Sequence, residues 1–243
     1  MSRAPTLADV RRAVRAHASP RRAAVNRSYF KTGPGEYGEG DVFVGLDVPT
    51  TRALARRFRD LPLAAVSRLI SSRIHEERVL GLMLLATRYG RAEPPEKERL
   101  FRLYVRHFPD INNWDLVDGS APAIVGAHLE GRSKAPLFAW ARSPRLWDRR
   151  IAVLATQAWI RKGRFVETFR LARLLLRDPE DLMHKAVGWM LREIDHRDRP
   201  ALVRFLERHG PRMPRTMLRY AIERFPEPER KRFLGLGRPS RLL

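Results

Sequence analysis

Apolar helix-forming segments recur along this chain at a nearly constant spacing. Five of them align in one frame, and its reference positions lie 37, 35, 35 and 34 residues apart: Arg78, Asp115, Arg150, Lys185 and Arg219. A two-helix repeat has about this length, and each such repeat buries its apolar stripe by stacking on its neighbours. The spacing therefore predicts an α-solenoid.

The rest of the chain agrees with a helical fold. From residue 50 onward ten segments have helical periodicity, with proline or aspartate at most joints: 50–59, 62–73, 75–89, 95–107, 113–128, 144–161, 166–177, 180–195, 198–208 and 214–225. Residues 7–30 predict two short basic helices broken near Ser19-Pro20, and residues 31–49 an ordered glycine-rich loop. No long stretch alternates with period two, so we predict an all-α fold of HEAT-like two-helix repeats with a concave basic groove.

The length favours a single domain over residues 1–243, and two domains at most. Its N-terminal part, 1–49, would hold the two basic helices and the glycine-rich loop. The last residues, 235–243, are basic and predict a flexible tail.

Charge is the strongest compositional signal. The chain has 48 Lys and Arg against 27 Asp and Glu, a formal charge of +21, and an isoelectric point near 11.5. Such an excess attracts polyanions, and nucleic acid is the first among them. An anionic membrane is the weaker alternative, because the basic residues are spread along the chain rather than gathered in one amphipathic helix or tail.

Other classes of site are disfavoured. The chain has no cysteine, and its seven histidines lack the HExxH spacing of a metal site. No apolar run approaches the ~20 residues that cross a bilayer, and the N-terminus lacks the apolar segment of a signal peptide. We therefore expect a cytoplasmic monomer with no metal, no cofactor and no membrane association.

One stretch, residues 112–118, combines an indole with two carboxylates. Asn112 or Asn113 is a suitable N-cap, and Trp114 and Asp118 are then four residues apart on one helix face. A structural interpretation is also available, because acidic residues favour a first helical turn and a Trp is usually buried. In the repeat frame, however, four residues from three consecutive repeats occupy positions on the same face of their helices and so point toward one groove, with Lys185 and Arg219 beside them: Trp114, Asp118, Arg150 and Trp189.

Several stretches resemble the HEAT-like-repeat alkylpurine DNA glycosylases, the AlkD-type DNA alkylation repair enzymes. They are YFKTGPGEYGEGDVFVG (29–45), NNWDLVD (112–118), LWDRRIAVLAT (146–156), HKAVGWMLRE (184–193) and MPRTMLRYAIERF (213–225). The resemblance implies excision of purines alkylated at N3 or N7 from double-stranded DNA, without flipping the damaged base into a pocket. It also implies a monofunctional hydrolase that does not cleave the strand.

The resemblance assigns roles to individual residues. Asp118 would be the catalytic carboxylate, Trp114 and Trp189 the flanking indoles, and Arg150 the DNA-contacting arginine, with its neighbour Arg149 as the alternative. The basic reference positions Arg78, Lys185 and Arg219 would contact phosphates. An alkylated purine is a cationic leaving group, so one carboxylate suffices to stabilise the oxocarbenium-like sugar.

A function of another class stays open. A non-catalytic α-solenoid scaffold that binds DNA or another polyanion would need the basic residues but not a carboxylate facing the phosphates. Two further residues have ordinary interpretations. His75 would be a helix-start residue, and Asp115 a cap or a partner of a neighbouring arginine in preference to an assistant of Asp118.

Overall fold

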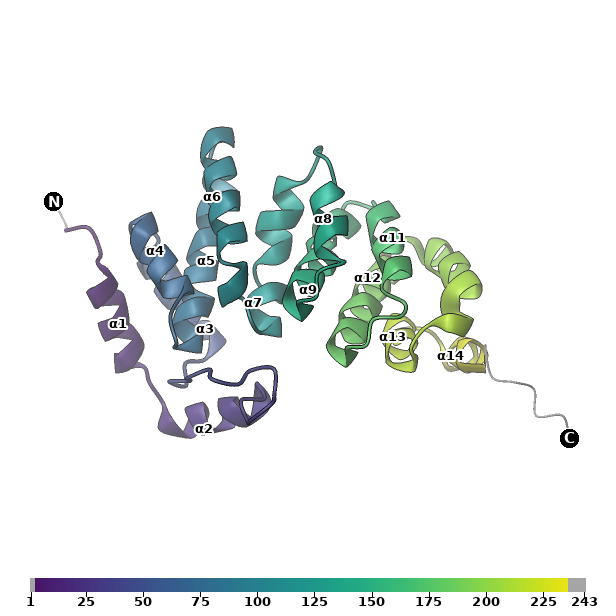
Figure 1. The fold of residues 1–243 in the computed structure, drawn as a ribbon, viewed down its shortest axis with the longest axis horizontal. Helices are drawn as coiled ribbons and strands as arrows, with labels where there is room; N and C mark the ends of the chain where they lie inside the picture. The colour runs from purple at the N-terminus through teal and green to yellow at the C-terminus, as the bar shows by residue number, and fades with distance from the viewer. Residues whose placement is uncertain (1–2, 236–243) are drawn as a thin grey trace, which may run out of the picture. The chain divides into compact units, whose positions relative to one another are not determined.

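The computed structural model describes residues 3–235 and confirms the all-α prediction (Figure 1). Within this range there is no strand, only an isolated parallel bridge between Val42 and Ile74. The chain divides into two compact units, Met1–His128 and Leu129–Leu243. The predicted tail lies, apart from Gly235, outside the described residues. None of the helices in residues 3–235 is both long enough and apolar enough to cross a membrane.

The first unit contains seven α-helices and two other helical turns among its described residues. The two predicted N-terminal helices are present, and Ser19 caps the second at the predicted break, with Pro20 in its first turn. The elements are α1 (Leu7–Ala16), α2 (Pro20–Tyr29), α3 (Val48–Arg57), α4 (Leu63–Ile70), α5 (His75–Arg91), α6 (Pro94–Arg106), the 3-10 turn η1 (Phe108–Asp110), α7 (Trp114–Asp118) and the π-helical turn η2 (Pro122–Gly126).

The second unit continues with helices of very unequal length. Its longest one, α12, has a kink at Asp198, where φ and ψ are −155° and 80°, so two helices meet at the predicted joint. The elements are α8 (Ala135–Trp140), α9 (Leu146–Ala155), α10 (Gln157–Ile160), α11 (Val166–Leu174), α12 (Asp181–His209), the 3-10 turn η3 (Gly210–Arg212), α13 (Arg215–Ala221) and α14 (Glu227–Gly235).

Within each unit, helices pack mainly on near neighbours in the sequence, as in an α-solenoid. In the first unit α5 packs on α3, α4 and α6, and in the second α12 packs on α9, α11 and α13 (Figure 1). Gly188 of α12 lets α13 approach closely, because a Cβ atom there would lie 2.5 Å from the Cβ atom of Tyr220. The predicted α-solenoid is confirmed.

Two predicted helices are interrupted. The segment 113–128 forms α7, a turn and then η2, because Pro122 has no N–H to donate to the carbonyl of Asp118 four residues earlier. The segment 144–161 breaks at Thr156, whose hydroxyl donates to the Val153 carbonyl over 2.7 Å.

Two helices of the second unit were not predicted. Helix α8 has only six residues and carries a proline in its first turn, which leaves no room for helical periodicity. Helix α14 buries one side chain, Phe233, so its apolar stripe is too narrow to detect.

Candidate active site

Helix α7 is short, and its sequence explains where it begins. Of the two predicted N-caps, Asn113 is the one observed, and its side chain accepts a hydrogen bond from the Trp114 N–H over 2.8 Å. Asp115 Oδ1 accepts from the Leu116 N–H over 2.9 Å, so Asp115 also caps the first turn, as predicted. Trp114 and Asp118 are the first and last residues of the helix and are both half-buried, so the four-residue spacing places them on one side.

The indole of Trp114 rests on aromatic side chains from the end of α2 and from the glycine-rich loop. It stacks on Phe30, with ring centroids 5.2 Å apart and an interplanar angle of 15°, and it meets Tyr29 edge-on at 5.8 Å. Phe30 stacks in turn on Phe43 at 5.1 Å. A cavity of about 440 Å³ opens beside these rings and is lined by Trp114, Tyr29, Phe43 and residues of α3 and α5.

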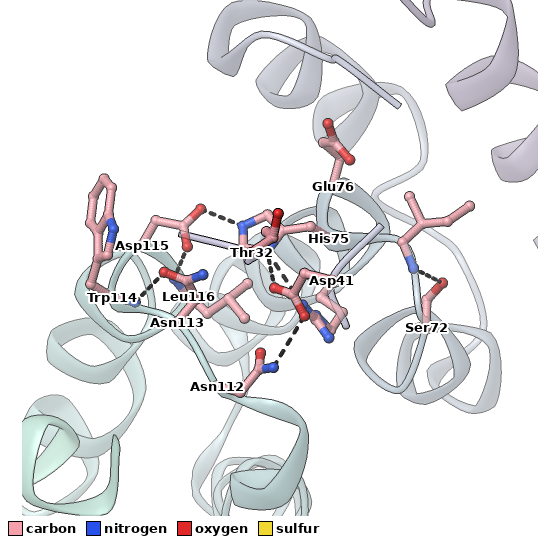
Figure 2. A network of polar contacts seen from close by, with 12 residues as sticks. Thr32, Asp41, Ser72, His75, Glu76, Asn112, Asn113, Trp114, Asp115 and Leu116 are labelled. Atoms are coloured by element: carbon pink, nitrogen blue, oxygen red, sulfur yellow. Dashed lines mark hydrogen bonds and ion pairs between the residues drawn. The ribbon is translucent and has the colours of Figure 1, made fainter. Parts of the chain in front are cut away.

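A buried polar network lies next to this aromatic stack (Figure 2). His75 is 1% exposed, and its ring nitrogens lie 2.8 Å from Asp115 Oδ2 and 3.0 Å from Asp41 Oδ2. Asp41 also forms an ion pair with Arg78 at 2.5 Å and accepts a hydrogen bond from Asn112 at 3.1 Å. Figure 2 shows Asp115 turned toward His75 while the Trp114 ring points away from these polar groups.

The network sets the charge of its members. Burial alone would lower the pKa of His75, but hydrogen bonds to Asp115 and Asp41 raise it to about 9. Burial would raise the pKa of Asp41, but hydrogen bonds from His75 and Arg78 lower it to about 2. At neutral pH an imidazolium therefore donates to two carboxylates.

These contacts extend the sequence analysis and correct it in part. Helix α5 does begin at His75, as predicted, but the imidazole is also the centre of the network. Asp115 is held by His75 and not by a neighbouring arginine. No spacing pattern could reveal this pair, because the two residues are 40 positions apart.

The glycine-rich loop is ordered, as predicted, and it is fixed by carboxylates. Glu76 accepts from the N–H groups of Val44 and Gly45, over 3.1 and 2.7 Å. Glu36 and Glu39 accept from the N–H groups of Gly33 and Gly35. These are backbone donors that a phosphate would need, so the loop is not a phosphate cradle.

Arg78, predicted to contact DNA, has a different position. Its side chain is buried and pairs with Asp41 inside the network. Its contact holds the loop on α5, and the prediction of a phosphate contact by Arg78 is not supported.

Two adjacent arginines of α9 differ in their contacts. Arg149 binds the Asp178 carboxylate through Nε and Nη2, at 2.7 and 3.3 Å, and donates through Nη1 to the carbonyls of Ser143 and Pro144. Arg150 Nη1 donates to the Leu182 carbonyl over 2.7 Å, in the first turn of α12. Both residues are buried, with Arg149 9% and Arg150 5% exposed, so which of the two contacts DNA remains a prediction.

Helix α12 carries the other predicted residues of the second unit. Lys185 and Trp189 are four residues apart and half-buried. Trp189 Nε1 donates to Glu193 over 3.1 Å, and Lys185 pairs with Asp181 at 2.8 Å. Arg219 is exposed on the neighbouring helix α13. The structure thus gathers Arg150, Lys185 and Trp189 on α9 and α12, while Trp114 and Asp118 belong to the first unit; a groove common to all of them remains a prediction.

Comparison with known proteins identifies the family. A family model described as DNA alkylation repair enzyme matches residues 10–225. A solved structure described as a predicted DNA alkylation repair enzyme from Enterococcus faecalis has a similar fold, with a TM-score of 0.68 and 17% sequence identity over 87% of this chain and 98% of that one. No curated protein matches. Because the family model covers most of the sequence, the chain belongs to the DNA alkylation repair enzyme family.

Proposed function

We propose that this protein is a monofunctional DNA glycosylase. Its substrates would be purines alkylated at N3 or N7 in double-stranded DNA, and it would hydrolyse the bond between the base and the deoxyribose. The membership in a DNA alkylation repair family supports this class of activity. The finer assignment is based on the carboxylate and the indole of α7.

The chemistry needs little more than one carboxylate. An N3- or N7-alkylated purine is positively charged, so it can leave without being protonated. As the glycosidic bond breaks, positive charge develops on the sugar, and the Asp118 carboxylate would stabilise that charge and orient the attacking water. Because the lesion needs no acid to leave, the base need not be flipped into a pocket.

The other residues would bind and orient the damaged strand. The faces of Trp114 and Trp189 attract a cationic nucleotide, which is worth on the order of 0.5–2 kcal/mol per ring. Arg150, Lys185 and Arg219 would contact phosphates.

The proposal depends most on the arrangement of Trp114 and Asp118 on α7. A five-residue helix places a half-buried carboxylate, Asp118, on the same side as the half-buried indole Trp114, and the indole is fixed by a stack of rings. A scaffold that only binds a polyanion gains nothing from a carboxylate held in this way, because it would repel phosphates.

A base-release assay tests the proposal. Single-turnover excision is measured on duplexes that contain one 7-methylguanine or one 3-methyladenine, for the wild type and for Asp118→Asn. The variant should lose on the order of 10³-fold in rate, because the charge acts in the transition state, and should bind DNA at least as tightly as the wild type. Asp110→Asn removes a half-buried carboxylate outside α7 and should excise normally. Binding without base release by the wild type would favour the scaffold.

A panel of lesions tests the basis of selectivity. Uracil and hypoxanthine leave as anions unless an acid or a hydrogen-bonding pocket assists them. The Asp118 carboxylate beside the Trp114 indole supplies neither, so neutral lesions should remain essentially untouched at a pH where cationic lesions are released. Efficient release of uracil would show that selectivity does not depend on the charge of the lesion.

A further inference from the structure

We propose that His75 is a positioning residue for excision: by holding Asp115 on one side and the aromatic stack on the other, it fixes α7 so that Trp114 and Asp118 keep their working orientation. This inference rests on the proposed function. His75 would not touch the DNA, and it would act through the side chains that it holds.

Helix α7 is short and depends on its neighbours for its orientation. A helix of five residues is not stable by itself, so its orientation depends on tertiary contacts. Leu116 and Val117 are buried and anchor one face. Asp115 anchors the polar side through its 2.8 Å contact with His75. Loss of this contact would remove the polar anchor of α7 and leave the helix held by its apolar face and by the stacking of Trp114 on Phe30.

The same imidazole supports the indole. The His75 ring stacks on Phe43 at 4.5 Å and contacts Phe30 at 4.9 Å. Phe30 is the ring on which Trp114 stacks. His75 therefore holds α7 through a carboxylate and, by way of Phe30, through Trp114.

A neutral imidazole can donate from only one nitrogen, whereas His75 faces a carboxylate at each nitrogen, so only the imidazolium satisfies both. Three charged groups face His75: Asp41 from the loop, Asp115 from α7 and Arg78 from its own helix. The two carboxylates outweigh the arginine, since the pKa of His75 is raised to about 9.

The main test uses His75→Phe in the full chain. Phenylalanine keeps the ring that packs on Phe30 and Phe43 but removes both donors. Single-turnover excision of 7-methylguanine should fall about 10- to 100-fold while the Kd for undamaged duplex stays unchanged, as is typical when a group that orients a reacting residue is lost. His75→Gln can still donate from its amide and should recover part of the rate.

A matched control separates positioning from general damage to the core. His128 is also a buried histidine of the first unit; it stacks on Phe101 and contacts the Glu98 carboxylate at 3.3 Å, away from α7. His128→Phe should keep the wild-type rate. If His75→Phe fails to fold, Asp115→Asn tests the same contact, and it too should lower the rate without weakening DNA binding.

The pH dependence of the excision rate distinguishes a positioning role of His75 from a merely structural one. In the wild type the excision rate should fall as pH rises through about 9, because the imidazolium loses one donor, and in His75→Gln this fall should be absent. The uncatalysed loss of base is subtracted at each pH. The inference is overturned if folded His75→Phe or Asp115→Asn excises at the wild-type rate, or if the profile is the same in His75→Gln.

Failure of the inference and failure of the proposed function are distinguishable. If the wild type releases no base, the proposed function fails. Nuclear magnetic resonance of ¹⁵N-histidine-labelled protein then still reports on His75, which should carry protons on both ring nitrogens at pH 7.5. A neutral His75 at that pH would overturn the inference whatever the activity.

Discussion

The two compact units use their charged residues differently. Residues 1–128 contain 21 Lys and Arg against 14 Asp and Glu, whereas residues 129–243 contain 27 against 13, so the second unit has twice the positive excess. In the first unit two carboxylates, Asp41 and Asp115, converge on the cation His75. In the second unit, arginines of α9 converge on the carboxylate Asp178 and on backbone carbonyls.

This difference suggests a division of work. The first unit would supply the carboxylate and indole that act on the sugar, because its polar groups orient α7. The second unit would supply most of the attraction for phosphate, because its cations are in excess. Substitutions in the first unit should therefore alter the rate of base excision, and substitutions in the second unit should alter the affinity for DNA. Arg149 is an exception, because its replacement should alter stability.

Replacement of Arg149 should have the largest effect on the free energy of unfolding. Arg149→Ala removes one partner of a buried ion pair and leaves the Asp178 carboxylate, 3% exposed, without its guanidinium. The free energy of unfolding should fall by about 3–5 kcal/mol, as measured by urea denaturation. Arg145→Ala breaks a partly exposed pair with Asp148 and should cost less than about 1 kcal/mol. Normal stability with weakened DNA binding in Arg149→Ala would place Arg149 in the DNA interface.

The second prediction concerns the pH dependence of stability in the first unit. The pKa of His75 is raised from 6.5 to about 9, so its stabilisation is complete below 6.5 and is lost as pH rises through 9. The pKa of Asp41 is lowered from 3.8 to about 2, so its stabilisation is complete above 3.8 and is lost as pH falls through 2. At 1.36 kcal/mol per pKa unit, each effect should be on the order of 2–3.5 kcal/mol at most.

Urea denaturation at a series of pH values tests this prediction. Stability should be greatest between about pH 4 and 6.5, and His75→Gln should lose the decline above that range. A wild-type stability that stays flat from pH 6.5 to 9.5 would mean that His75 is not held as an imidazolium.

The smallest effect is expected for replacement of Arg150, which should change the affinity for DNA. This prediction tests whether the second unit supplies the phosphate contacts. Affinity for undamaged duplex should fall steeply between about 50 and 200 mM salt, because each phosphate contact releases counterions. Arg150→Ala should weaken binding about tenfold and reduce the slope of log K against log salt by about one. The matched change in the first unit, His75→Phe, should leave the slope unchanged. A slope that is the same in Arg150→Ala would remove Arg150 from the phosphate contacts.

Much of the fold could be predicted because it depends on local patterns. The two N-terminal helices, the ordered loop and the joint near residue 198 follow from capping residues and periodicity that span a few positions. The break after Asp118 was visible only as Pro122, and the short helices α8 and α14 bury too little to leave a pattern.

The candidate site was predictable only in part, for a physical reason. Trp114 and Asp118 are four residues apart on one helix, so the spacing suffices to place them on one side. The His75 imidazole contacts Asp115, which lies 40 residues later in the sequence. It also contacts Asp41, which lies 74 residues before Asp115. Such long-range contacts leave no local sequence pattern. Arg149 and Arg150 are adjacent and chemically identical, and only their partners distinguish them.

The glycine-rich loop has a consequence for recombining members of this family. Connecting loops usually absorb insertions and deletions, but this one is anchored along its length by Asp41, Phe43 and the N–H groups that bind Glu76. Gly45, at a φ of 84°, could not become a larger residue, because a Cβ atom would lie 2.2 Å from the Ser19 carbonyl oxygen. An inserted residue would pull these anchors apart. In a chimaera, α2, the loop, the start of α5 and α7 therefore have to be exchanged as one block, although α3, α4 and α6 lie between them in the chain.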